Sequence, residues 1–305
     1  MQTVGRFAPS PSGRMHLGNV LCALLAWLSA RHQNGAFLLR IEDLDAMRCP
    51  RSYADLIMDD LRWLGLDWDG EVPYQSERAP IYEKYEQILR EKGLLYPCFC
   101  SRAALHAASA PHLSDGRVLY AGTCRELTPA EIEEKRKKRA PATRVRVPDE
   151  IISFTDGVFG AYSENLAEEC GDFIIRRSDG VFAYQLAVTV DDGLLGVTEV
   201  VRGSDLISST PRQIWLYRLF GFEPPHFVHI PLLCDVDGRR LSKRDEDLDL
   251  GLLRERFTPE QVIGALAFAA HLTDRAEPAS VRELVQDFDW SRIPRHELCL
   301  PPMFR

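Results

Sequence analysis

The chain has 305 residues, and its 37 lysines and arginines against 45 aspartates and glutamates give a formal net charge of −8. Hydrophobic residues make up 45% of the chain and charged residues 27%, which excludes the disordered and fibrous classes. Net acidity also argues against indiscriminate nucleic-acid binding, because that affinity comes mainly from lysines and arginines that release counterions.

The N-terminal region carries no targeting or membrane signal. The uncharged stretch from Met15 to Ala30 is shorter than the ~20 apolar residues that a membrane-spanning helix needs. Residues 1–6 lack the basic and apolar regions of a signal peptide. We therefore expect a cytoplasmic protein without a membrane span, in which the eight cysteines are thiols or metal ligands rather than disulfides.

The first predicted elements alternate between strand and helix. A strand is predicted over 3–8, a turn over 9–13, a helix over 17–30 and a strand over 36–41, which ends in the acidic cluster Glu42, Asp43 and Asp45. This order predicts a parallel-sheet unit whose ligands bind at the carboxyl ends of the strands. Helical patterns follow over 52–64 and 80–91.

A change in composition between Pro97 and about Pro148 predicts an inserted subdomain. Sheet-like runs resume over 172–175, 181–190 and 198–201, and a helix over 212–220 and a strand over 227–234 follow. The capping-box pattern from Thr258 to Gln261, ahead of the apolar run 262–272, predicts a small helical appendix.

The segment from Arg6 to Asn19 is the first candidate site. Its proline-stiffened turn delivers His16 and Gly18 to the start of a helix, where free amides suit a phosphate and glycine permits close approach. Taken alone, His-x-Gly after a strand also fits an N-capping turn with a surface histidine. The whole segment resembles the first signature of the class I aminoacyl-tRNA synthetases, in the form of the glutamyl and glutaminyl branch. The resemblance implies ATP binding by Pro9, His16, Gly18 and Asn19, the last standing where many members carry a second histidine.

The basic run from Arg239 to Arg244 is the second candidate, and in isolation it predicts a solvated loop. Leu241, Ser242 and Lys243 nevertheless resemble the second class I signature, a lysine loop that closes over ATP, with Arg244 in place of the usual serine. Negative charge develops on phosphoryl oxygens when a carboxylate attacks the α-phosphate, and a cation such as Lys243 lowers that barrier. The resemblance implies that His16 and Lys243 are catalytic through charge stabilisation, with Mg accompanying the ATP.

Candidates for amino-acid binding lie at three separated points of the chain. Singly, Glu42 fits a surface ion pair, Tyr184 a core residue and Arg202 a sheet-end cation. Together the segments 40–45, 182–188 and 200–205 resemble the glutamate pocket of glutamyl-tRNA synthetases. A glutamine pocket needs no countercharge for the side chain, so Arg202 indicates glutamate. The binding residues implied by the resemblance are Arg6, Phe7, Ala8, Pro9, Ser10, Glu42, Tyr184 and Arg202.

Cys98, Cys100 and Cys124 have spacings that can supply three corners of a tetrahedral zinc site, although free cysteines are often small buried hydrophobes. In the family that the chain resembles, the insertion carries one structural zinc, which implies Tyr120 as the fourth ligand. His106, His112 and water are the alternatives to Tyr120. A basic run, residues 135–139, fits a solvated face or a contact with an RNA backbone equally well.

The resemblance covers about Gly5 to Leu250. The small number of residues after Lys243 leaves no room for a helical anticodon-binding region, and this shortened form resembles the glutamyl-queuosine tRNA(Asp) synthetases. The resemblance implies an α/β fold with a Rossmann-like parallel-sheet core, an inserted zinc-binding subdomain and a short helical C-terminal appendix. The expected division is 1–96 and 172–238 for the two halves of the core, 97–171 for the insertion, and 239–305 for the lysine loop and appendix.

The resemblance implies a ligase that activates L-glutamate with ATP to glutamyl-adenylate without tRNA. It would then transfer glutamate to the cyclopentenediol of queuosine, at the wobble position of tRNA(Asp), and we expect a monomer. The alternatives are a shortened glutamyl-tRNA synthetase that charges tRNA(Glu), a nucleotidyltransferase, and a non-catalytic zinc-containing RNA-binding module. Retention of His16, Glu42, Arg202 and Lys243 argues against the non-catalytic module.

Overall fold

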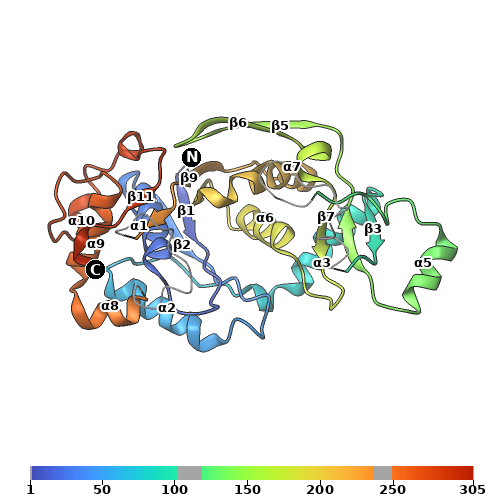
Figure 1. Ribbon diagram of the computed structural model, residues 1–305, viewed down its shortest axis with the longest axis horizontal. Coiled ribbons are helices and arrows are strands. Elements are labelled where there is room, and N and C mark those ends of the chain that lie inside the picture. The colour runs from blue at the N-terminus through green and yellow to red at the C-terminus, as the bar shows by residue number, and fades with distance from the viewer. Residues whose placement is uncertain (1, 102–118, 236–248, 305) are drawn as a thin grey trace.

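Two pairs of parallel strands form the centre of the computed structural model, which describes residues 2–101, 119–235 and 249–304. Strand β1 (Val4–Phe7) pairs with β2 (Ala36–Leu39), and β8 (Glu199–Gly203) pairs with β9 (His226–Ile230) (Figure 1). The two pairs meet where the amide of Thr198 donates to Val4 O at 2.9 Å. Strands near the N-terminus and strands beyond residue 198 therefore build one core.

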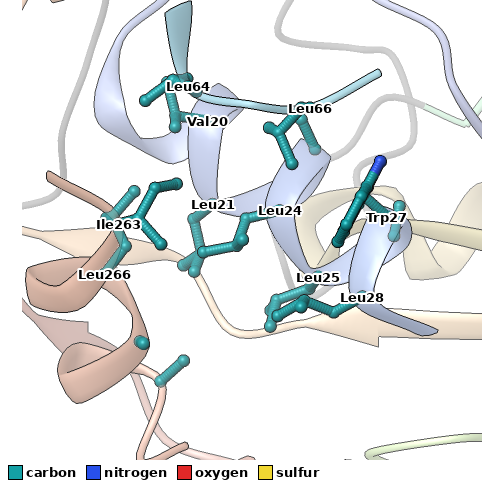
Figure 2. Packing of buried hydrophobic residues seen from close by; sticks show 14 of the residues in the cluster. Val20, Leu21, Leu24, Leu25, Trp27, Leu28, Leu64, Leu66, Ile263 and Leu266 are labelled. Atoms are coloured by element: carbon teal, nitrogen blue, oxygen red, sulfur yellow. The ribbon is translucent and has the colours of Figure 1, made fainter. Parts of the chain in front are cut away.

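Helix α1 (Leu17–His32) fills the main hydrophobic core. Because this helix is apolar on nearly every face, it is buried between the strands and the C-terminal helices. Figure 2 shows its leucines meeting side chains from α9 (Pro259–Ala269) and from the segment after α2 (Arg51–Trp63). The labelled residues are Val20, Leu21, Leu24, Leu25, Trp27, Leu28, Leu64, Leu66, Ile263 and Leu266.

A second layer lies at the opposite end of the molecule from the C-terminal helices (Figure 1). It contains an antiparallel sheet of β3 (Leu95–Cys98), β4 (Ala142–Val145) and β7 (Phe173–Arg176), with α5 (Pro129–Arg136) beyond it. The hairpin of β5 (Ile151–Asp156) and β6 (Gly160–Asn165) extends back from this end toward the core. Helices α3 (Ala79–Glu91), α6 (Tyr184–Leu194) and α7 (Thr210–Phe220) lie between the two ends.

The C-terminal region ends in short elements beside α1. Strand β10 (Leu233–Cys234) pairs with β11 (Leu298–Cys299). Helices α8 (Leu250–Arg256), α9 and α10 (Val281–Leu284) pack near it. The predicted capping box is confirmed, because Thr258 Oγ1 accepts from the Gln261 amide and the Gln261 side chain accepts from the Thr258 amide.

Two sequence-based expectations are wrong. The run 181–190, expected as sheet, is largely the helix α6, and the expected strand over 227–234 is divided at Pro231 into β9 and β10. Helix α6 is buried nearly all round, so its β-branched apolar residues show no helical period and mimic a buried strand. The four-part division of the chain stays a prediction. In the described ranges, no helix combines the length and apolar character needed to cross a membrane.

Gly264 allows the chain to cross α9 at close range. A Cβ atom built on Gly264 would lie 1.9 Å from the backbone oxygen of Glu277, which is far inside van der Waals contact. We predict that Gly264→Ala destabilises the protein by ~1–3 kcal/mol, because backbone would have to move. Alanine normally stabilises a helix relative to glycine, so a gain in the free energy of unfolding would contradict this packing. Phe268→Ala, on the exposed side of the same helix, is the control in denaturant titrations.

Candidate active site

A cavity of about 530 Å³ lies at the carboxyl ends of β1, β8 and β9, beside the start of α1. The structure brings together around it every described residue that the sequence analysis assigned to ATP or glutamate. These are Arg6, Phe7, Ala8, Pro9, Ser10, His16, Gly18, Asn19, Glu42, Tyr184 and Arg202. Leu241, Ser242 and Lys243 lie outside the described residues, as do His106 and His112.

His16 begins α1 as its N-cap. Its Nδ1 accepts the Gly18 amide at 3.1 Å, and its own amide donates to Asn19 Oδ1 at 3.3 Å. A Cβ atom on residue 18 would lie 2.9 Å from His16 Cε1, so glycine is required for the ring to lie this close. Asn19 thus holds the cap in place, and the positive end of the helix dipole faces the cavity.

A buried array of charges supports the floor of the cavity. Asp192, on α6, accepts Arg6 Nε at 3.3 Å and is also hydrogen-bonded to Arg40 Nη1, while Arg6 Nη1 donates to Val201 O at 3.0 Å. Burial acts to raise the pKa of Asp192, but the two guanidinium groups outweigh it and hold that pKa below its usual value. Arg6 therefore links β1 to the backbone of β8 and to the carboxylate of Asp192 on α6.

Arg40, which is fully buried, extends the array to Glu42. Its Nη2 donates to Glu42 Oε1 at 3.0 Å. Its Nε forms an ion pair with Asp191 Oδ2 at 3.7 Å. Asp191 also accepts Arg78 Nε at 2.7 Å and Tyr82 OH at 2.8 Å. Burial raises the pKa of the Glu42 carboxyl, although Arg40 opposes this. Three arginines thus balance three carboxylates beneath the cavity.

Arg202 differs from these arginines because all of its contacts in the described residues are neutral. Its Nε donates to His229 Nε2 at 3.0 Å, and three further donors reach Gln213, Thr210 and Leu206. Nη1 also reaches Tyr184 OH at 3.4 Å. Arg202 is 4% exposed, and in the described part of the chain no carboxylate lies within 4.0 Å of it. Among the described residues, its positive charge therefore has no carboxylate partner.

A second cavity of about 390 Å³ adjoins the first and shares Ser10, Glu42 and Tyr184 with it. Its remaining wall is mixed in character and includes Asp45, Arg177 and Phe182. The side chains of Ser10, Glu42 and Tyr184 therefore stand between the two cavities.

Several residues that organise the site were not found from the sequence. Arg40, Asp191 and Asp192 carry the buried charge array, and Asp156 and His229 support Arg202. His229 could have been found by predicting that β8 pairs with β9, because this pairing places His229 directly opposite Arg202. No local pattern connects Asp192 with Arg6.

The three predicted cysteine ligands form a cluster beyond the core, at the end of β3. Their Sγ atoms all lie within 4.8 Å of one another, and Cys100 Sγ is 3.7 Å from Cys124 Sγ. Tyr120 OH lies 3.7 Å from Cys98 Sγ and accepts the Cys124 amide at 2.8 Å. Burial acts to raise the pKa of the Cys98 thiol, but the Arg144 guanidinium, 3.2 Å away, helps to hold that pKa below its usual value.

The family model for the catalytic domain of class I tRNA synthetases of the E and Q type matches residues 2–291. The chain belongs to this family. This class I synthetase is similar to proteins named glutamyl-Q tRNA(Asp) synthetase. The relative from Symbiobacterium thermophilum is 50% identical over 97% of this chain and 95% of that protein. The relative from Geobacter sulfurreducens is 49% identical over 95% of this chain and 93% of that protein.

Solved structures agree with the family assignment. A glutamate tRNA ligase from Elizabethkingia meningosepticum, in complex with its amino acid, has a TM-score of 0.84 and 28% identity, covering 100% of this chain and 68% of that one. A methionyl-tRNA synthetase from Mycobacterium tuberculosis has a TM-score of 0.54 at 13% identity, covering 90% of this chain and 64% of that one, and shares the fold alone. The predicted class I α/β fold and the predicted ligase class are confirmed.

Proposed function

We propose that this synthetase activates L-glutamate with ATP to glutamyl-adenylate without tRNA, and then transfers glutamate to the cyclopentenediol of queuosine in tRNA(Asp). We propose that it acts as a monomer. ATP and tRNA as substrates fit a cytoplasmic protein.

The observation that carries the proposal is the charge pattern of the cavity. Arg202 offers a buried positive charge that the described residues do not neutralise, and Glu42 offers a carboxylate on the same cavity. An acidic α-amino acid needs both groups, because a cation such as Arg202 can bind its side-chain carboxylate and an anion such as Glu42 can bind its ammonium group. Tyr184 and Ser10 add hydroxyl groups, and Arg6, Phe7, Ala8 and Pro9 form the adjoining wall.

ATP binding is assigned to the start of α1 and to the lysine loop. Pro9, His16, Gly18 and Asn19 would hold the nucleotide, with Leu241, Ser242 and Lys243 contributing from outside the described residues. An oxygen of the glutamate α-carboxylate attacks the α-phosphorus of Mg-ATP, an acyl–phosphate bond forms, and pyrophosphate leaves. His16 and Lys243 would stabilise the charge that develops on the phosphoryl oxygens.

The second step transfers the acyl group to tRNA. A hydroxyl of the cyclopentenediol attacks the carbonyl carbon of the adenylate, the ester forms, the hydroxyl proton passes to solvent, and AMP leaves. We propose that the acceptor approaches from the second cavity, which shares Ser10, Glu42 and Tyr184 with the first. The choice of queuosine in tRNA(Asp) is supported by the names of relatives that match over nearly their whole length.

Pyrophosphate exchange and the position of labelled glutamate test this function. We expect glutamate-dependent exchange between ATP and pyrophosphate in the absence of tRNA. Radiolabelled glutamate should then appear on tRNA(Asp) only when the tRNA carries queuosine. Strict dependence of exchange on tRNA(Glu), with label at the 3′ end of tRNA lacking queuosine, would instead indicate a shortened glutamyl-tRNA synthetase. Absence of exchange would indicate a binding module.

Removing the charge of Arg202 should weaken glutamate selectively. A buried charge pair is worth ~2 kcal/mol or more, so Arg202→Leu should lower kcat/KM for glutamate in exchange by at least about 30-fold. KM for ATP should stay near its wild-type value, and the preference for glutamate over glutamine should shrink. Arg176→Leu is the matched control, because Arg176 pairs with Glu86 and lines neither cavity. Equal losses in the two variants would contradict the assignment.

We also propose that Cys98, Cys100, Cys124 and Tyr120 hold one structural zinc ion. In a tetrahedral site with Zn–S bonds of ~2.3 Å, the sulfurs stand ~3.8 Å apart, close to the 3.7 Å between Cys100 and Cys124. The 3.7 Å between Cys98 Sγ and Tyr120 OH is close to what the opposite edge of the same tetrahedron requires. The amide of Phe99 donates to Cys124 Sγ at 3.4 Å, as expected around a thiolate. The ion would fasten the end of β3 to the segment before α5.

Zinc content and thermal unfolding test this site. We expect about one zinc per chain by elemental analysis, and a lower unfolding temperature after chelation, because metal binding contributes folding free energy. Cys100→Ser should lose the zinc, whereas Cys299→Ser, at an exposed cysteine, should keep it. Tyr120→Phe should weaken zinc binding by at least about tenfold. An unchanged affinity in Tyr120→Phe would assign the fourth position to a histidine or to water.

A further inference from the structure

The guanidinium of Arg202 has two unlike sides. Its three short hydrogen bonds, of 3.0, 2.8 and 2.8 Å, go to His229, Gln213 and Thr210, none of which lines the cavity. Its two long contacts, both 3.4 Å, go to Tyr184 OH and Leu206 O, which do line it. Arg202 is therefore held firmly from behind, and its weakly bonded side faces the space where a ligand binds.

His229 occupies the central position behind Arg202. The two residues stand directly opposite each other in the parallel pairing of β8 and β9, and His229 is fully buried. Its ring stacks on Phe227 with an interplanar angle of 11°. This packing leaves the imidazole little freedom, so its two nitrogens have fixed directions.

Asp156 determines which nitrogen of His229 carries the proton. Asp156 Oδ2 accepts the His229 amide at 3.0 Å and lies 2.6 Å from His229 Nδ1, while Oδ1 accepts the amides of Val158 and Phe159. A carboxylate with these donors is ionised and requires a proton on Nδ1. The lone pair of Nε2 is then free to accept Nε–H of Arg202.

A neutral ring protonated on Nδ1 fits all three polar neighbours, because Nδ1 donates to Asp156 while Arg202 Nε and Thr210 Oγ1, 3.0 and 3.2 Å from Nε2, can both donate to that nitrogen. A protonated Nε2 would point a donor at the donor of Arg202, and an unprotonated Nδ1 would face the Asp156 carboxylate. The charged groups that face the ring are Asp156, Arg202 and, farther away, Arg6. Burial and the charge of Arg202 lower the pKa of His229, and although the hydrogen bond to Asp156 opposes them, that pKa stays below its ordinary value.

The hairpin of β5 and β6 brings Asp156 to this position from a distant part of the chain. Its turn lies against β9, where the Gly157 amide donates to Phe227 O at 2.9 Å. A Cβ atom on Gly157 would lie 2.8 Å from Val228 Cγ2, so only glycine allows this approach. In Figure 1 the hairpin extends over α7 toward β9.

We propose that His229 is a positioning residue for substrate selection, held in its Nδ1–H form by Asp156 so that it orients Arg202 without neutralising it. A carboxylate in the place of His229 would pair with Arg202 and cancel the charge that selects an acidic side chain. A neutral acceptor satisfies the buried donor and preserves that charge. The inference rests on the proposed binding of the glutamate side chain by Arg202.

Two amide variants separate the two ends of His229. The amide of Asn reaches the position of Nδ1, so His229→Asn keeps a donor for Asp156 and removes the acceptor for Arg202. The amide of Gln reaches the position of Nε2, so His229→Gln keeps the acceptor for Arg202. Both variants remove the ring and are matched in polarity. Each is measured in full-length protein by glutamate-dependent ATP–pyrophosphate exchange, by glutamate titration calorimetry and by thermal unfolding.

We expect His229→Asn to raise KM for glutamate by about tenfold or more, since a misplaced binding group costs such factors. Its kcat and its KM for ATP should change little, and His229→Gln should restore KM for glutamate most of the way. Equal KM values for glutamate in the two variants, or parallel losses toward ATP, would show a merely structural role. If Arg202→Leu loses glutamate selection but both His229 variants keep it, the positioning role fails while the proposed function stands.

The protonation of His229 in the unaltered protein gives a readout that does not depend on any variant. Nitrogen NMR of the histidine rings should show one ring with Nδ1 protonated and Nε2 unprotonated throughout the pH range where exposed histidines titrate. A proton on Nε2, or an imidazolium within that range, would overturn the inference. Lack of any glutamate-dependent exchange in the wild type would overturn the proposed function, and the NMR result would still decide the form of His229.

Discussion

The contact of Asp192 with two arginines is the interaction on which the site depends. Asp192 comes from α6, Arg6 from β1 and Arg40 from the residue after β2, so one carboxylate joins three elements. Each of these groups is nearly or fully buried, and a buried charge without its partner costs several kcal/mol. Loss of Asp192 would take from Arg6 its carboxylate partner in the described residues, while Arg40 would keep Glu42 and Asp191. The shape of the cavity floor is therefore set by electrostatics as much as by packing.

The same array explains how a cavity can be both stable and selective. Arginines and carboxylates beneath the floor satisfy one another, so the protein does not need a ligand to keep them buried. Arg202 is treated differently, since neutral acceptors satisfy its donors and leave its charge uncompensated among the described residues. The charges of the array are thus matched internally, whereas Arg202, which we propose binds the substrate, has no carboxylate partner among the described residues. This separation lets the free protein fold with the pocket already formed.

Much of the site could be predicted because its residues lie in continuous segments. Arg6, Ser10, His16 and Gly18 share one continuous strand–turn–helix segment, and Glu42, Tyr184 and Arg202 each lie at or near the end of an element, within a recognisable string. Asp192 and His229 could not be predicted in the same way, because their roles arise only when distant elements pack. Helix α6, which carries Asp192, was itself mistaken for sheet because its burial erased the helical period. The contacts that shape the pocket join residues far apart in the sequence, so local patterns do not predict them. The residues that line the pocket lie in short, recognisable strings, so local patterns do.

The hydrogen bonds that build the pocket span long stretches of the chain. Arg6 reaches residues that are 186 and 195 positions away, and Asp156 reaches His229 across 73 positions. Pairings between such distant residues form late in folding, because the chain must lose the entropy of closing a long loop before the contact can stabilise it. During synthesis the pocket cannot be complete until β9 has left the ribosome and met the hairpin. Glutamate binding is therefore coupled to the global fold, and a ligand that occupies the pocket stabilises the whole molecule rather than one local segment.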